Sequence, residues 1–186
     1  MLGRKADETK VEKQAKKKVN VVCTSLFLNN NELRNVVGLR SVLDSVMFHP
    51  SKLQWLDLSY NYLETIDEEI LNFPNLKTFY FHGNYLSNLE EIEKLSTLPQ
   101  LMSVTFYGNF IEQIKGYRMY VLGLLYKHYE TLKKMDTVLI TNKEMDNIIV
   151  WNEYINAKKA GKLKKLVPEN IKKPPEKEDE EQVKLQ

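Results

Sequence analysis

LQWLDLSYNYL, residues 53–63, decides the fold, because its spacing of apolar residues around one asparagine recurs along the chain. Aligned on that asparagine, the copies read CTSLFLNNNEL (23–33), LQWLDLSYNYL (53–63), LKTFYFHGNYL (76–86) and LMSVTFYGNFI (101–111). A fifth, degenerate copy begins at Leu132 with LKKMDTV. One copy would be weak evidence, but four in register, starting 23 to 30 residues apart, predict a chain of stacked structural repeats.

The shared pattern is L-x-x-L-x-L-x-x-N-x-L, the leucine-rich repeat signature. Its fourth and sixth positions, such as Leu56 and Leu58, alternate as in a half-buried strand, and strands this short must stack as a parallel sheet. Beyond each asparagine the apolar spacing lengthens to three or four residues, which favours helical or 3₁₀ turns. We therefore expect an α/β fold: a short solenoid with a parallel concave sheet, a helical or 3₁₀ convex side and a C-terminal cap.

Each repeat has its asparagine where the chain turns inward after the strand. A buried turn leaves backbone N–H and C=O groups that need hydrogen-bond partners. An amide side chain can donate and accept, so it fits such a turn. The sequence predicts a ladder of asparagines that ties each turn to the neighbouring repeat. The predicted ladder residues are Asn31, Asn61, Asn84 and Asn109.

Composition divides the chain into three parts. Residues 1–19 form a basic N-terminal tail, residues 20–147 hold the repeats and the cap, and residues 148–186 form a helical extension with a charged tail. Both tails lack large apolar clusters, so we expect them to be flexible. Their excess of lysine could anchor the protein to an acidic polymer, such as RNA or the acidic tails of tubulin. It could equally keep a repeat protein soluble, and composition leaves both readings open.

Several classes of protein are not expected. The sequence has no run of eighteen apolar residues, so we expect no membrane-spanning helix. The polar N-terminus lacks the apolar core of a signal peptide, and a single cysteine excludes an intrachain disulfide. These features predict a cytoplasmic protein that does not bind membranes.

The third, fifth and seventh positions of each repeat face outward on the concave side of the predicted sheet. Several of them hold large aromatic side chains among small polar groups, a composition typical of protein-binding hot spots. The predicted partner-binding residues, with one tyrosine at the rim, are Phe27, Trp55, Asp57, Tyr60, Tyr80, His82 and Tyr107. Coverage of these rings by flanking segments of the same chain is the alternative that the sequence leaves open.

The search for catalytic or metal-binding chemistry finds little. The three histidines fall on different repeats, away from metal-ligand spacing with the lone cysteine. Ser59, His82 and Asp57 could meet on neighbouring strands, but an open sheet offers neither an oxyanion hole nor a water-excluding pocket. We expect no enzymatic activity, no cofactor, no metal and no small-molecule substrate.

After Asn109 the chain holds a Tyr-Arg pair, an apolar helical stretch from Ile111 to Leu125 and an incomplete L-x-x-L-D motif. This resembles the C-terminal cap of the SDS22-like leucine-rich repeat family, whose members include a regulator of protein phosphatase-1. The matching cap residues are Tyr117, Arg118, Leu132, Met135 and Asp136. Methionine replaces the last leucine, and Thr131 stands where that family has proline.

Residues between the fixed positions of the repeat signature point to a smaller group within this family. W-x-D-L-S-x-N from Trp55, F-H-G-N from Phe81 and G-Y-R-x-Y-V-L from Gly116 resemble a group of small leucine-rich repeat proteins of ciliated cells, over roughly residues 20–155. The resemblance implies a non-catalytic component of the ciliary axoneme, with other axonemal proteins and tubulin as candidate partners.

Two other functions stay open. One is a phosphatase regulatory subunit, although SDS22-like proteins use longer stacks with more concave acids. The other is a protein-holding component of a ribonucleoprotein; direct nucleic-acid binding is not expected, because the body between the tails is acidic. A stripe from Ile148 through Trp151 could pack on the cap or dock on a partner as a helix.

Overall fold

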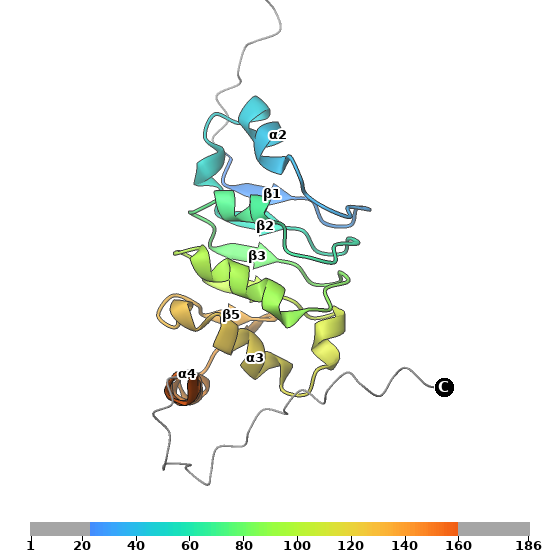
Figure 1. Cartoon of the computed structure of the whole chain (residues 1–186). Helices are drawn as coiled ribbons and strands as arrows, with labels where there is room; N and C mark the ends of the chain where they lie inside the picture. The colour runs from blue at the N-terminus through green and yellow to red at the C-terminus, as the bar shows by residue number, and fades with distance from the viewer. Residues whose placement is uncertain (1–22, 160–186) are drawn as a thin grey trace, which may run out of the picture.

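The computed structural model describes residues 23–159, whose strands form one six-stranded sheet in the order β1 to β6 (Figure 1). The first five strands are parallel to their neighbours, and β6 turns back antiparallel to β5. The strands are β1 (Ser25–Phe27), β2 (Trp55–Asp57), β3 (Thr78–Tyr80), β4 (Ser103–Thr105), β5 (Lys134–Met135) and β6 (Val138–Leu139). The predicted parallel sheet of short strands is confirmed.

Register in this sheet places equivalent repeat positions side by side. Leu56 pairs with Leu26 on one side and with Phe79 on the other, all three at the fourth repeat position. Side chains at one repeat position therefore form a row across the strands, because neighbouring strands lie about 4.8 Å apart. Side chains of one type that recur at the same repeat position therefore form a continuous strip of surface across the strands.

Helical segments connect the strands on the other side of the sheet, as Figure 1 shows. They are α2 (Leu39–Val46), η1 (Pro50–Lys52), η2 (Glu68–Asn72), η3 (Leu89–Thr97), η4 (Phe110–Gln113), α3 (Tyr117–Leu124), η5 (Tyr126–His128) and α4 (Asn142–Lys159). Most are 3₁₀ helices, which confirms the predicted helical or 3₁₀ convex side. None of the helices within residues 23–159 is long and apolar enough to cross a membrane.

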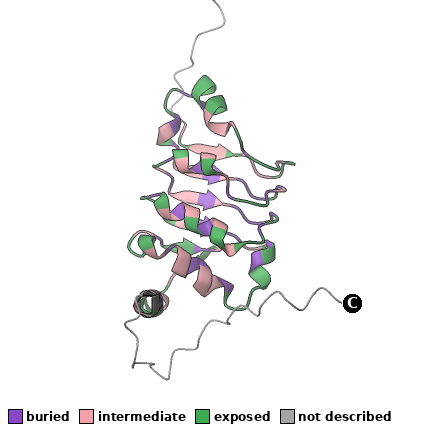
Figure 2. Cartoon of the chain, viewed as in Figure 1, coloured by how far each residue is buried: buried purple, intermediate pink, exposed green. Residues whose placement is uncertain are grey.

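The frame positions of the repeats make the core between sheet and helices. Leu53, Leu56 and Leu58 of the 53–63 repeat are fully buried, as are Phe79 and Phe81 at the equivalent positions of the next. Figure 2 shows buried residues recurring in strand after strand through the middle of the stack. Truncating one of these leucines to alanine would cost about 2–5 kcal/mol.

The cap region departs from the sequence prediction in two places. The apolar face from Ile111 to Leu125 predicts one helix, but η4 ends before Ile114 and α3 starts after Gly116. Gly116 adopts a left-handed conformation (φ 83°), which glycine alone takes without steric cost and which breaks the helix. The boundary placed between residues 147 and 148 falls inside α4, which begins at Asn142.

Helix α4 packs against the cap helix α3. Ile148 is buried, and Cδ1 of Trp151 lies 3.9 Å from the point where a Cβ on Gly123 would stand. Of the two positions open to Trp151, the structure thus shows packing on the cap. The two predicted tails, residues 1–19 and the segment beyond residue 159, lie outside the described residues.

Asparagine side chains join each turn to the repeat before it. Asn84 Nδ2 donates to Leu58 O of the preceding repeat and to Phe81 O of its own, both at 3.0 Å. Its Oδ1 accepts from Leu63 N at 3.0 Å. Asn61 and Asn109 repeat this arrangement one step before and one step after. All three side chains are buried, so no water can replace these bonds.

Asn31 differs from the other three. It is exposed, and its Nδ2 donates only within its own turn, to Leu28 O at 3.0 Å and Asn29 O at 3.1 Å. No repeat precedes it among residues 23–159, so it has no neighbouring turn to join. The ladder in the structure therefore has three members that bridge repeats, and Asn31 is not one of them.

This difference gives a stability test with a built-in control. Asn84→Ala leaves Leu63 N buried without its acceptor and removes one of the two amide donors from Leu58 O and from Phe81 O, which Asn61 and Asn109 still bond. We expect the free energy of unfolding to fall by about 1–3 kcal/mol. Asn31→Ala removes only exposed bonds and should cost less than about 1 kcal/mol. Urea denaturation followed by circular dichroism measures both. Equal losses for the two variants would contradict the ladder.

Candidate functional site: the concave face and its cap

Six ring side chains form one continuous row across the concave face of the sheet, here called the concave row. Ring centroids of neighbours lie 5.9 Å apart for Phe27 and Trp55, 5.4 Å for Trp55 and Tyr80, and 5.9 Å for Tyr80 and His82. His82 also meets Tyr60 at 5.1 Å and Tyr107 at 4.4 Å. All six aromatic or imidazole residues proposed from the sequence are thus linked by pairwise ring contacts.

The concave row is partly open to solvent. Phe27 and Tyr60 are 58% and 53% exposed, while Trp55, Tyr80 and Tyr107 are half-buried and His82 is buried. The described residues leave the two outer rings uncovered. Rings that already pack on one another lose little side-chain freedom on binding, so such a row favours association with another surface.

Trp55 supports this surface in an unusual way. Its indole Nε1 is buried and has no hydrogen-bond acceptor among the described residues. A buried N–H without an acceptor costs about 1–3 kcal/mol, so the ring stays there against a penalty. In return, the Trp55 ring contacts both Phe27 and Tyr80 and so keeps the row continuous.

His82 lies at the centre of the row as a flat ring. It stacks on Tyr107 at an interplanar angle of 15°, and its Nδ1 lies 2.8 Å from Oγ1 of Thr105. Burial lowers the pKa of His82 below its ordinary value of 6.5, while Asp57 and Asp136 oppose this shift. The imidazole is therefore neutral at pH 7, which suits stacking and an apolar partner.

Tyr60 occupies a turn position that disfavours large side chains. The residue before the asparagine of each of the four repeats has positive φ: 55° at Asn30, 53° at Tyr60, 67° at Gly83 and 69° at Gly108. Asparagine and glycine tolerate this left-handed conformation, whereas tyrosine costs about 1–2 kcal/mol there. The Tyr60 ring lies over Gly83, where an added Cβ would come within 2.7 Å of its Cδ1.

The polar residues of the concave face do not assemble a catalytic group. Ser59 Oγ donates to Asp57 Oδ1 at 2.6 Å, and the polar partner of His82 is Thr105 instead of Ser59. Within residues 23–159, no three His, Cys, Asp or Glu side chains lie close enough to hold a metal ion. Asp57 contributes a carboxylate to the concave face, and Ser59 in the same turn holds it by donating from its N–H and its Oγ.

Asp136 closes the end of the sheet by standing in for a backbone carbonyl. In the earlier repeats the N–H at the sixth position donates to a backbone C=O of the next strand, for example Phe81 N to Thr105 O at 3.0 Å. At the last repeat, Phe106 N donates instead to the Asp136 side chain, whose Oδ1 lies 2.6 Å away. Tyr117 OH donates to the other carboxylate oxygen, Oδ2, at 2.9 Å.

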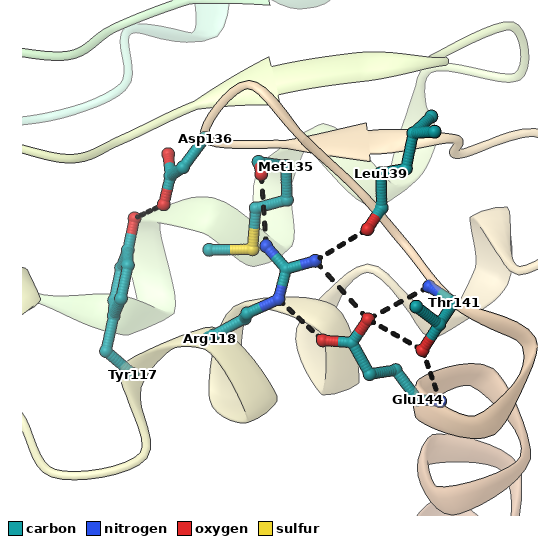
Figure 3. A network of polar contacts seen from close by, with 7 residues as sticks. All are labelled: Tyr117, Arg118, Met135, Asp136, Leu139, Thr141 and Glu144. Carbon is teal, nitrogen blue, oxygen red and sulfur yellow. Dashed lines mark hydrogen bonds and ion pairs between the residues drawn. The ribbon is translucent and has the colours of Figure 1, made fainter.

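Arg118 holds the rest of the cap together, as Figure 3 shows. Its Nε donates to Glu144 Oε1 at 2.7 Å and its Nη1 to Met135 O at 3.0 Å, so α3 is joined to α4 and to β5. Glu144 Oε2 also accepts from Thr141 N at 2.9 Å. Leu132 and Met135, the remaining predicted cap residues, are buried beneath this network.

Sequence reasoning missed a second row of rings. Tyr62, Tyr85 and Phe110 each follow a ladder asparagine, and in the structure they stack on one another. The signal was present in the alignment, because three of the four repeats have an aromatic residue at that position.

Comparisons with known proteins agree with this architecture. Residues 51–94 match the family model described as leucine rich repeats (2 copies). Leucine-rich repeat-containing protein 51 of Rattus norvegicus is 38% identical over 143 residues, which cover 77% of this chain and 72% of that protein. The Homo sapiens protein of the same name is 39% identical over 137 residues, covering 73% of this chain and 69% of that one.

A second named protein and one solved structure are also similar. Probable U2 small nuclear ribonucleoprotein A' of Caenorhabditis elegans is 38% identical over 73 residues, 39% of this chain and 29% of that protein. Among solved structures, a chain of the Drosophila melanogaster SNF/U2A' complex superposes with a TM-score of 0.55 at 20% identity. That superposition covers 76% of this chain and 83% of the other, and it shows a shared fold.

The Arg118–Glu144 pair predicts a pH-dependent contribution to stability. The hydrogen bond from Arg118 is the main cause that lowers the pKa of Glu144 from 4.5 to about 2. Because the folded pKa is the lower one, the stabilisation is complete above about pH 4.5 and is lost as pH falls toward 2. We expect Glu144→Gln to cost about 1 kcal/mol at pH 7, a modest value because solvent screens the pair.

In urea denaturation, the free energy of unfolding of Glu144→Gln should approach that of the wild type as pH falls from 4.5 to 2.5. Glu153→Gln, in an exposed position of the same helix, is the control and should stay close to the wild type at all pH values. A Glu144→Gln deficit that is unchanged at pH 2.5, or absent at pH 7, would contradict the assignment.

Proposed function

We propose that this chain, which belongs to the family of leucine-rich repeat-containing protein 51, is a non-catalytic scaffold that binds another protein through its concave row. The observation that carries the proposal is the continuity of that row, in which each ring touches the next from Phe27 to Tyr107. Rings held in contact and partly open to solvent have the composition of a binding hot spot.

Two features of the row favour a binding role over a purely structural one. Tyr60 keeps a strained left-handed backbone where glycine or asparagine would fold at lower cost. Trp55 keeps a buried N–H without an acceptor among the described residues. Both residues lower the stability of the scaffold, so their presence is better explained by binding than by folding.

The partner that fits is a protein segment with an apolar or aromatic face. His82 is neutral at pH 7 and Asp57 is the carboxylate fixed beside the row, so the row itself presents little charge. Apolar and aromatic side chains would gain the most from burying Phe27 and Tyr60, the most exposed rings.

We extend the proposal to a structural role in the ciliary axoneme. Its support is the resemblance to small leucine-rich repeat proteins of ciliated cells, which implies a cytoplasmic protein with axonemal partners and tubulin among the candidates. The basic tails would supply a second anchor on acidic surfaces such as tubulin. A ribonucleoprotein role is the second candidate, favoured by the likeness to the Caenorhabditis elegans U2 A' protein.

Tyr60→Asn separates binding from folding. Asparagine fits the left-handed turn, as Asn30 does in the first repeat, so the free energy of unfolding should stay level or rise by up to about 1 kcal/mol. Binding should weaken about tenfold or more, because one of the two most exposed rings of the row is lost. Tyr129→Asn removes another exposed tyrosine, which directly follows η5 and has its ring contact with Tyr126 instead of the row, and it serves as the matched control.

The measurement is cross-linking mass spectrometry on tagged protein in detergent-stripped ciliated cells. Cross-links to axonemal proteins or tubulin that are lost with Tyr60→Asn and kept with Tyr129→Asn would support the proposal. Identical cross-links from both variants would remove the concave row as the binding surface. Links to a phosphatase, or links released by nuclease, would replace the axonemal role with one of the alternatives.

A further inference from the structure

The second row of rings consists of three side chains stacked with nearly parallel planes along one edge of the solenoid: Tyr62, Tyr85 and Phe110. Ring centroids are 5.6 Å apart for Tyr62 and Tyr85, with an interplanar angle of 9°. They are 5.8 Å apart for Tyr85 and Phe110, with an angle of 20°. We call these three residues the edge row. It is distinct from the concave row, because it follows the ladder asparagines instead of preceding them.

One end of the edge row already binds a guanidinium group of this chain. Cζ of Arg34 lies 5.4 Å from the centre of the Tyr62 ring. Arginine prefers this arrangement, because its planar cation is attracted to the face of an aromatic ring. Arg34 therefore shows within the molecule which chemical group the stacked rings accept.

The other end of the edge row opens into a surface pocket of about 380 Å³. Its lining is Asn84, Tyr85, Gly108, Asn109, Phe110, Glu112 and Gln113. Phe110 is 54% exposed and Tyr85 44% exposed, so both rings can be reached from solvent. The pocket thus combines aromatic faces with one carboxylate and one exposed amide.

Glu112 is held in place at this pocket by the backbone. Its Oε2 accepts from Gly108 N at 2.6 Å. In the earlier repeats that N–H donates to a carbonyl of the next turn, as Gly83 N does to Tyr107 O at 2.9 Å. Glu112 Oε1 accepts no hydrogen bond from the residues that the structure describes. The carboxylate is therefore fixed, charged and able to accept from a ligand.

We infer that this pocket binds an arginine side chain of a partner protein, with the guanidinium against the rings of the edge row and donating to Glu112. The geometry supplies the two things that a guanidinium requires, a ring face and a fixed carboxylate oxygen. Arg34 at the opposite end provides the internal precedent.

Charge favours a basic partner segment over a nucleic acid. Stacked rings also suit the bases of a single strand, but such sites lie in positively charged grooves. Here Glu112 lines the pocket, and residues 19–157 have a net charge of −5. A phosphate backbone would be repelled where a guanidinium is attracted.

The test is a nuclear magnetic resonance titration of the full-length protein with N-acetyl-arginine amide. The matched probe is N-acetyl-citrulline amide, which has the same shape without the charge. Arginine should cause saturable shifts at Tyr85, Gly108, Phe110 and Gln113, and citrulline should bind about five-fold or more weakly.

Three variants complete the test. Glu112→Gln keeps an oxygen for Gly108 N–H but removes the charge, and Phe110→Leu keeps apolar volume but removes the ring; each should weaken arginine binding about five-fold. Glu93→Gln removes an exposed charge on η3 and should bind like the wild type. Equal binding of arginine and citrulline, no effect of Glu112→Gln, or shifts produced by decathymidine but not by arginine would each overturn the inference.

Neither outcome depends on the concave row. A protein that loses its axonemal cross-links with Tyr60→Asn can still bind arginine at the edge row, because the two rows lie on different repeat positions.

Discussion

Hydrogen bonding of the buried turns is the constraint on which the rest of the structure depends. Each strand of three residues or fewer must end in a turn that enters the core, where backbone groups cannot reach water. Asn61, Asn84 and Asn109 meet that need with one amide each, bonded both to their own repeat and to the preceding one. Because the amide spans two repeats, it fixes the spacing between them as well as the shape of the turn. A ladder of this kind has two ends, and the ends need different solutions: Asn31 is exposed at the first, while the carboxylates of Asp136 and Glu112 replace missing carbonyls at the last.

Fixed spacing explains why the protein has two rows of aromatic rings. With equivalent positions side by side, a tyrosine in one repeat meets the residue at the same position of the next. The concave row arises from positions that precede the ladder asparagine, and the edge row from the position that follows it. Rings placed in this way need no dedicated supports, since the scaffold holds them at contact distance. The fold thus turns a small number of aromatic residues at one repeat position into an extended aromatic surface.

Positions within a repeat could be predicted from the sequence because local spacing determines them. Leu56 is buried and Asn84 bridges two repeats in the way that the alignment implies. The edge row was equally visible in the alignment, but its residues lie outside the strands, where alternation does not predict the direction of a side chain. The break at Gly116 depends on one left-handed residue inside an apolar pattern that reads as continuous.

The hydrogen-bonding roles of the two carboxylates at the end of the sheet could not be predicted from repeat spacing, for a different reason. Asp136 accepts from Phe106 N only because β5 is too short to continue the ladder of backbone bonds past β4. Glu112 accepts from Gly108 N only because no further turn stands beside it. Their roles follow from elements that are absent from the last repeat, and a single sequence does not show which bonds those elements would have made.

Tyr60 is the position where the proposed binding role and the demands of folding oppose each other. The turn before the ladder asparagine favours glycine or asparagine, and three of the four repeats comply. The exception is the repeat at residues 53–63, where Tyr60 has a left-handed conformation and its ring lies over Gly83 and against His82. The missing Cβ of Gly83 is what makes room for that ring, so the two residues are matched across neighbouring repeats. The binding role proposed for the concave row gives this strain a physical explanation, because the strained backbone holds an exposed ring in place and lowers the stability of the fold.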